Sequence, residues 1–89
     1  MDASVQAIST DEIDKAIDLR GMECPLPVIK TKLALKELAE GQILQVSTTD
    51  PMSVVDLRVF CMRSGNELLD WQENDDEFEF FIRRANKRT

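Results

Sequence analysis

The chain has 89 residues and a formal net charge of −6, a length that fits one domain with one modest hydrophobic core. An acidic domain repels the phosphate backbone, so the composition disfavours direct nucleic-acid binding. No apolar run approaches the roughly 20 residues that a membrane helix needs, and the polar N-terminus lacks a secretory signal. We therefore expect a cytoplasmic protein without a membrane segment.

The two cysteines, Cys24 and Cys61, limit the chemistry that this chain can perform. They lack CxxC spacing, and the sequence contains no histidine. A zinc site needs four ligands, or three and a water molecule, so we expect no metal site. Cysteine–histidine catalysis is excluded because no imidazole is available as the base. No cofactor motif is present, so no cofactor is expected, and a reducing compartment disfavours a Cys24–Cys61 disulfide.

The N-terminal segment, residues 1–14, shows no clear periodicity and is predicted to be a flexible arm. Residues 15–19 follow as the first strand, with Ile17 and Leu19 facing the core. The loop after this strand contains Gly21, which permits a sharp turn.

The first helix is expected from Pro25 to Ala39, closed by Gly41, because proline suits the first helical position and glycine ends helices. At about 100° per residue, one set of side chains shares the core face: Val28, Thr31, Ala34, Leu35, Leu38 and Ala39. A second stripe, formed by Leu26, Ile29 and Leu33, lies on the other side among lysines. This stripe is either additional core or a partner surface beside Cys24, and both interpretations stay open.

The middle of the chain repeats this pattern. Residues 43–48 are rich in β-branched side chains and predict a strand. Asp50 then caps, and Pro51 opens, a second helix that runs to Ser64. Its core face is expected to hold Val54, Leu57, Phe60 and Cys61, which makes Cys61 a buried structural thiol. Off that face, a further apolar stripe indicates a partner or self-association surface: Val55, Val59 and Met62.

The C-terminal part predicts a hairpin of two strands, residues 67–73 and 77–83. In the first strand, Leu69 and Trp71 are expected on one side and Leu68 on the other. In the second, alternate apolar residues share one side: Phe78, Phe80 and Ile82. The seven acidic residues from Glu67 to Glu79 are typical of a solvated sheet edge that resists aggregation. The basic residues of the last segment are interpreted as a solvated tail: Arg83, Arg84, Lys87 and Arg88.

The element order β-α-β-α-β-β predicts an α/β fold, a two-layer α/β sandwich. Two helices are expected on one face of a four-stranded mixed sheet. Residues 15–84 would form the single domain, and residues 85–89 a basic C-terminal tail. The strand order stays open, because right-handed crossovers place both helices on one side only for particular orders.

Cys24 is the candidate reactive residue, because it directly precedes Pro25 at the start of the first helix. The expected N-cap position offers unpaired backbone N–H groups and the positive end of the helix dipole, which favour a thiolate. The alternative is a buried core cysteine, but the flanking Glu23 and Pro25 are not part of an apolar run. Arg20 favours the thiolate and Glu23 opposes it, so the direction of any shift in the pKa of Cys24 stays open.

One stretch resembles the N-terminal signature of the TusA/SirA-like sulfur carrier family, including its CPxP motif: Asp18-Leu19-Arg20-Gly21-Met22-Glu23-Cys24-Pro25-Leu26-Pro27. The similarity runs from about Ile17 to Arg83 and continues in four later segments: Thr49-Asp50-Pro51, Asp56-Leu57, Phe60-Cys61 and Gly65-Asn66-Glu67-Leu68.

The resemblance implies a two-layer α/β sandwich that moves sulfane sulfur. Cys24 would accept sulfur as a persulfide from a cysteine desulfurase or a rhodanese-like enzyme and pass it to an acceptor protein. Known destinations in the family include tRNA thiolation, molybdenum cofactor supply and sulfur oxidation. The supporting motif residues are Arg20, Gly21, Pro25 and Pro27. Without a base, metal or cofactor motif, the chain is expected to act with sulfurtransferases and not as a stand-alone enzyme.

A second hypothesis is a non-enzymatic regulatory or adaptor protein. In that case the apolar stripes of the two helices bind a partner, and Cys24 is mainly a helix cap.

Overall fold

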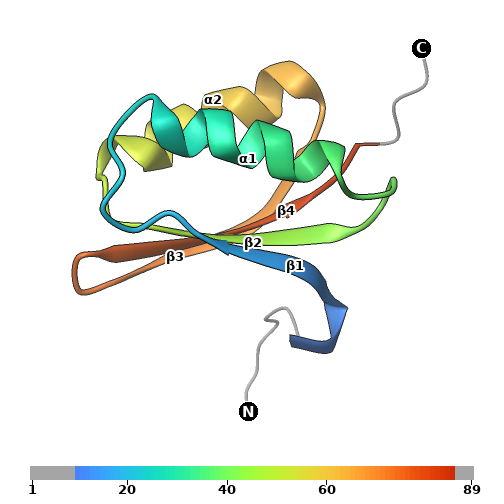
Figure 1. The fold of residues 1–89 in the computed structure, drawn as a ribbon, viewed down its shortest axis with the longest axis horizontal. Coiled ribbons are helices and arrows are strands. Elements are labelled where there is room, and N and C mark those ends of the chain that lie inside the picture. Colours follow the sequence, from blue (N-terminus) through green and yellow to red (C-terminus); the bar gives the residue numbers. More distant parts are fainter. Residues whose placement is uncertain (1–9, 86–89) are drawn as a thin grey trace.

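The computed structural model describes residues 10–85, which form one sheet covered by two helices (Figure 1). The elements follow in chain order: a 3-10 helix (Thr10–Glu12), β1 (Ile13–Asp18), α1 (Leu26–Lys36), β2 (Ile43–Thr48), α2 (Met52–Ser64), β3 (Glu67–Asn74) and β4 (Glu77–Arg83). The predicted order β-α-β-α-β-β is therefore confirmed.

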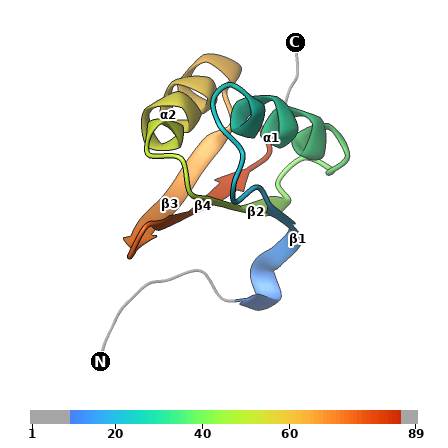
Figure 2. The same ribbon diagram turned by 60° about the vertical axis from the view of Figure 1, so that its left-hand side comes forward.

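The sheet has the strand order β1-β2-β4-β3. β1 and β2 are parallel, whereas β4 is antiparallel to both β2 and β3. The connections through α1 and α2 both step in the same direction across the sheet, so right-handed crossovers place both helices on one face. Figure 2 shows the two helices side by side on that face. The structure thus confirms the two-layer sandwich and supplies the strand order that the sequence left open.

The hydrophobic core lies between the helices and the sheet, and Phe80 of β4 is fully buried at its centre. The ring of Phe80 stacks on Trp71 of β3, with ring centroids 6.1 Å apart. Side chains from β2, α2 and β4 complete the fully buried set: Leu44, Val46, Leu57 and Ile82. The alternation predicted for β4 is confirmed, because Phe78, Phe80 and Ile82 all belong to this core.

The side chains of β3 are distributed differently from the prediction. A register shift between Leu68 and Asp70 interrupts the pairing of β3 with β4. A bulge adds one residue to a strand and changes which side chains share a face. Leu68 and Trp71 both pack against the core, so the prediction of Leu68 on the face opposite Trp71 is wrong.

The first helix is shorter than predicted, because α1 ends at Lys36 and Ala39 is exposed. The Glu37 N–H already bonds to Ala34 O, three residues back, at 3.0 Å, and the Ala39 N–H donates to Gln42 Oε1 at 2.8 Å. These bonds turn the chain out of the helix before Gly41. The other predicted core positions of this helix are buried or half-buried: Val28, Thr31, Ala34, Leu35 and Leu38.

The predicted ends of the domain differ from the structure as well. Residues 10–14, assigned to the arm, form the 3-10 helix and the start of β1, while residues 1–9 lie outside the described residues. Arg83 pairs with Glu67 of β3 at 2.7 Å. Arg84 donates to Leu35 O at 2.8 Å and to Leu38 O at 2.6 Å. These two arginines are therefore part of the fold and not of a solvated tail, whereas Lys87 and Arg88 lie outside the described residues.

Replacing Arg84 with methionine is expected to lower the free energy of unfolding by about 1–3 kcal/mol, because two carbonyls at the end of α1 lose a charged donor. Arg83→Met is the matched control. It removes only the exposed ion pair with Glu67, which is worth about 0–1 kcal/mol. Urea unfolding monitored by Trp71 fluorescence measures both variants, and equal losses would contradict the role given to Arg84.

Candidate functional site

Cys24 lies in the loop between β1 and α1, and its side chain is exposed. The residue at the helix cap is Pro25, which follows a cis peptide bond, and α1 begins at Leu26. Cys24 therefore lies one position before the cap, and the prediction that it is the N-cap is wrong. The Leu26 N–H bonds to Glu23 O at 2.9 Å, so part of the helix start is satisfied by the loop itself. The exposure of Cys24 contradicts the alternative of a buried core cysteine.

The loop between β2 and α2 holds the Cys24 loop in place. Gly21, with φ of 87°, donates its N–H to Thr49 Oγ1 at 2.9 Å. The Cys24 N–H donates to Asp50 Oδ2 at 2.8 Å. The second oxygen, Asp50 Oδ1, accepts from the Met52 N–H at 3.0 Å in the first turn of α2. Asp50 thus joins the two loops. The N-cap of α2 is Pro51, so the prediction that Asp50 is the cap is wrong by one position, although its carboxylate accepts a bond from the first turn.

Two carboxylates raise the pKa of Cys24. The largest cause is the hydrogen bond between the Cys24 thiol and the Asp56 carboxylate, followed by partial burial and the negative charges of Asp56 and Asp50. A nearby negative charge disfavours the thiolate. The direction of the shift in the pKa of Cys24, which the sequence left open, is therefore upward, against the effect expected of the helix start. Sequence reasoning named Asp56 only as part of the family resemblance and gave it no role at the thiol, although it is the only acidic residue within α2 and none occurs within α1.

Arg20 does not act on the thiol. Its guanidinium Nε lies 2.8 Å from Asp18 Oδ1, and Nη1 lies 3.4 Å from Glu77 Oε2. The hydrogen bond from Arg20 lowers the pKa of Asp18 to about 2. Arg20 therefore ties the start of the Cys24 loop to the β3–β4 hairpin, and the structure gives no support to its predicted help for the thiolate.

A groove with a volume of about 550 Å³ runs between the two helices and contains Cys24 at one end. Its walls come from α1 and α2: Pro25, Val28, Lys32, Asp56, Val59, Phe60, Arg63 and Ser64. Both helices lie in crossovers between parallel strands, so their N-terminal ends lie at the same end of the molecule. The groove therefore extends from the thiol toward the C-terminal ends of the helices.

The apolar stripes flank this groove. Leu26, Ile29 and Leu33 are 45%, 46% and 51% exposed, so the interpretation of this stripe as additional core is wrong. The stripe of α2 is exposed as well: Met52, Val55, Val59 and Met62. Large exposed apolar patches mark interaction surfaces.

The basic residues of the helices belong to the same layer of the fold: Lys30, Lys32, Lys36, Arg58 and Arg63. With Asp56 as their only acid, the two helices carry a net positive charge in an otherwise acidic protein.

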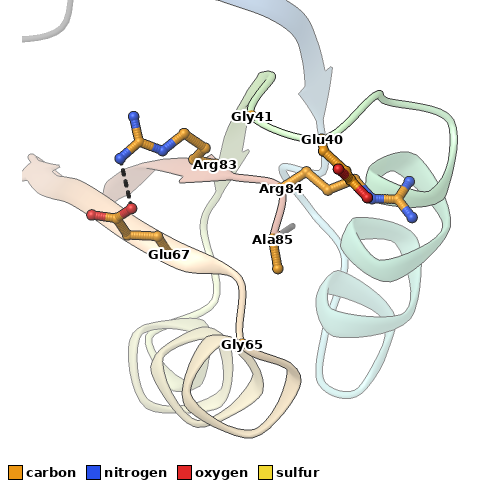
Figure 3. Close-up of a pocket in the computed structure, with 7 residues that line it drawn as sticks. All are labelled: Glu40, Gly41, Gly65, Glu67, Arg83, Arg84 and Ala85. Carbon is orange, nitrogen blue, oxygen red and sulfur yellow. Dashed lines mark hydrogen bonds and ion pairs between the residues drawn. The ribbon is translucent and has the colours of Figure 1, made fainter. Parts of the chain in front are cut away.

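A second pocket, of about 430 Å³, lies at the opposite ends of the helices. Figure 3 shows its lining residues, including the Arg83–Glu67 pair. Gly41 and Gly65, which follow α1 and α2, border it, so it is remote from Cys24.

The second cysteine, Cys61, is buried: it is 4% exposed, and burial raises the pKa of its thiol to about 11. The prediction that Cys61 is a buried thiol is confirmed.

Within residues 10–85, no group of three or more histidine, cysteine or acidic side chains is arranged to hold a metal ion. Within the same range, no helix is long and apolar enough to span a membrane.

Comparisons with known proteins place the whole domain in a family. The family model described as "Sulfurtransferase TusA" matches residues 15–84. This chain belongs to the TusA family. It is 38% identical over 74 residues to the sulfur carrier protein TusA of Allochromatium vinosum, covering 83% of this chain and 97% of that protein. It is 40% identical over 75 residues to a putative sulfur carrier protein of Halobacterium salinarum, covering 83% and 93%.

A solved structure shares the fold. The crystal structure of a SirA-like protein from Desulfitobacterium hafniense superimposes with a TM-score of 0.71 and 31% sequence identity, covering 81% of this chain and 99% of that one. The resemblance to TusA/SirA-like sulfur carriers is therefore confirmed, and a sulfur carrier role follows from family membership. Such a role requires interaction with sulfur donors and sulfur acceptors.

Proposed function

We propose that Cys24 is the residue that carries sulfur: it accepts sulfane sulfur as a persulfide and passes it to an acceptor protein. The observation that carries the proposal is an exposed thiol, held by two cross-loop hydrogen bonds, at the end of an apolar groove. The other cysteine, Cys61, is buried and unsuited to exchange. Arg20, Gly21, Pro25 and Pro27 serve as positioning residues of the loop and the helix start.

The transfer step is a displacement between sulfur atoms. The Cys24 thiolate attacks the outer sulfur of a persulfide on the donor protein, forms a new S–S bond and releases the donor's thiolate. Delivery is the same displacement with the roles exchanged: a thiolate of the acceptor attacks the outer sulfur of the Cys24 persulfide and releases the Cys24 thiolate. Asp56 and Asp50 raise the pKa of Cys24, and the sequence contains no histidine that could act as a base, so we propose that the donor supplies the group that accepts the thiol proton. This dependence suits a carrier that acts with sulfurtransferases and has no activity of its own.

The donor is inferred to be a cysteine desulfurase or a rhodanese-like enzyme, and the acceptor a protein of a sulfur relay such as tRNA thiolation, molybdenum cofactor supply or sulfur oxidation. A cytoplasmic location fits, because a reducing compartment keeps Cys24 as a thiol. We propose that both partners dock on the helix layer, where the stripes and the groove adjoin the thiol. The positive charge of the helices favours partners whose surface is acidic where it faces the lysines and arginines of α1 and α2. No direct contact with nucleic acid is proposed.

Sulfur loading tests the proposal directly. The purified protein is incubated with a cysteine desulfurase and cysteine, without reductant, and its mass is measured. We expect the mass of one added sulfur atom, located by peptide mapping on the peptide that contains Cys24. Added sulfur on the Cys61 peptide alone would contradict the assignment.

Adding a negative charge to the docking surface is expected to slow loading. Leu33→Glu on α1 and Val59→Glu on α2 should each lower the loading rate at limiting desulfurase roughly tenfold, because loss of a central apolar contact costs about 1–2 kcal/mol of binding. Gln72→Glu on β3 is the matched control, since it adds the same side chain on an exposed strand.

The adaptor hypothesis rests on the same exposed stripes. It predicts that cellular activity is lost in Leu33→Glu and Val59→Glu but retained when the thiol is removed. Unchanged loading in both variants would contradict docking at the helix layer.

A further inference from the structure

The groove beside Cys24 has opposite charges at its two ends. Cys24 and Asp56 lie near the N-terminal ends of the helices, whereas Lys32 and Arg63 line the groove farther along. A helix rises 1.5 Å per residue, so the backbones of Lys32 and Arg63 lie roughly 10 Å along the groove from those of Cys24 and Asp56. Neither cation forms an ion pair with Asp50 or Asp56 among the described residues.

Two carboxylates lie beside Cys24, one from the β2–α2 loop and one from α2, and a third is adjacent in the chain. Asp50 of the β2–α2 loop accepts the Cys24 N–H at 2.8 Å, Asp56 faces the groove from α2, and Glu23 is adjacent in the chain. The cation of the loop, Arg20, is already bonded to Asp18 and Glu77. Among the described residues, Asp56 forms no ion pair. Asp50 and Asp56 therefore have no ion-pair partner among residues 10–85, and their charges give the thiol a negative immediate environment.

A negative electrostatic field at the thiol repels most small sulfur compounds, because most of them are anions. Sulfite, for example, can attack the outer sulfur of a Cys24 persulfide. The new S–S bond makes thiosulfate, the S–S bond to Cys24 breaks, and its electron pair stays on Cys24 as a thiolate. The charges balance without an added oxidant, since sulfite (2−) and the persulfide (1−) give thiosulfate (2−) and the thiolate (1−). Both reactants are negative, so Asp50 and Asp56 oppose their approach.

We propose, building on the assignment of Cys24 as the sulfur carrier, that Asp50 and Asp56 are specificity-determining residues that restrict sulfur exchange at Cys24 to protein partners. They slow loading and unloading by small anionic sulfur compounds. A protein partner overcomes the barrier by placing a cationic side chain beside Asp56, which neutralises the field at the moment of transfer. The inference concerns which reactants reach the sulfur, and it leaves the transfer step itself unchanged.

A pair of alkylating reagents of similar size tests the field. Iodoacetate is an anion and iodoacetamide is neutral, and both react with the thiolate, so the ratio of their rates is independent of the thiolate fraction. The native protein and Asp56→Asn are alkylated at low salt, and the Cys24 peptide is quantified by mass spectrometry. We expect the iodoacetate-to-iodoacetamide ratio to rise roughly three- to tenfold in Asp56→Asn. Salt at about 1 M should reduce the difference, because it shortens the Debye length to about 3 Å.

Glu40→Gln is the matched control, because it removes an exposed carboxylate beyond the opposite end of α1. Its ratio should equal that of the native protein. In the loaded carriers, sulfite should remove sulfur from Asp56→Asn roughly three- to tenfold faster than from the native protein. Normal loading with an unchanged alkylation ratio in Asp56→Asn overturns this inference alone. A native protein that takes no sulfur on Cys24 overturns the proposed function and this inference with it.

Discussion

Replacing Cys24 with serine is expected to reduce sulfur loading from one atom per chain to background. A hydroxyl is similar in size to the thiol but forms no persulfide. The loop and the docking surface therefore stay intact, while the atom that accepts sulfur is lost. The bond from the Cys24 N–H to the Asp50 carboxylate uses only the backbone of residue 24, so it persists in the variant. Mass spectrometry after incubation with a desulfurase and cysteine measures the loss, and circular dichroism verifies the fold.

Cys61→Ala is the control for this experiment. Cys61 lies on the buried face of α2, so the substitution is expected to reduce stability modestly and leave loading intact. Sulfur uptake by Cys24→Ser, together with its absence in Cys61→Ala, would reverse the assignment of the two cysteines. Retention of cellular activity by Cys24→Ser would instead favour the adaptor hypothesis, in which the apolar stripes carry the function.

Replacing Phe80 with alanine is expected to lower the free energy of unfolding by about 3–5 kcal/mol. Phe80 is fully buried and stacks on Trp71, so truncation removes a large apolar contact and leaves a cavity between the sheet and the helices. Domains of this size have a total stability of about 5–15 kcal/mol, so the variant would lose a large part of it. Urea unfolding followed by far-ultraviolet circular dichroism measures the change.

Glu79→Ala, on the same strand, is the matched control for this measurement. Its side chain alternates with Phe80 and Phe78 and faces away from the core, so a change of about 0.5 kcal/mol or less is expected. Phe80→Leu keeps much of the side-chain volume and should lose less stability than Phe80→Ala, which provides a readout if the alanine variant does not fold. A loss for Phe80→Leu no larger than that of Glu79→Ala would contradict the central place of Phe80 in the core.

Much of the fold could be predicted because its signals are local. Alternating apolar residues identified β4, and β-branched residues bounded β2 at the observed residues, 43–48. The spacing of apolar residues on both helices separated the buried face from the exposed stripes, since helical geometry repeats over a few residues. The errors occurred where hydrogen bonds overrode the pattern. The bulge after Leu68 and the early end of α1 at Lys36 depend on strand pairing and helix capping, which cannot be predicted from the spacing of apolar residues.

The candidate site, like the fold, could be predicted only in part from the sequence. The reactive position, Cys24, could be recognised from the sequence alone, because a thiol before a proline-started helix is defined by adjacent residues. Its electrostatic environment could not be recognised. Asp50 and Asp56 are distant in sequence and reach the thiol only because the strand order sets the two helices side by side with their N-terminal ends together. Coulomb interactions depend on distance through space, so only the tertiary structure decided that two carboxylates lie near the thiol and raise its pKa.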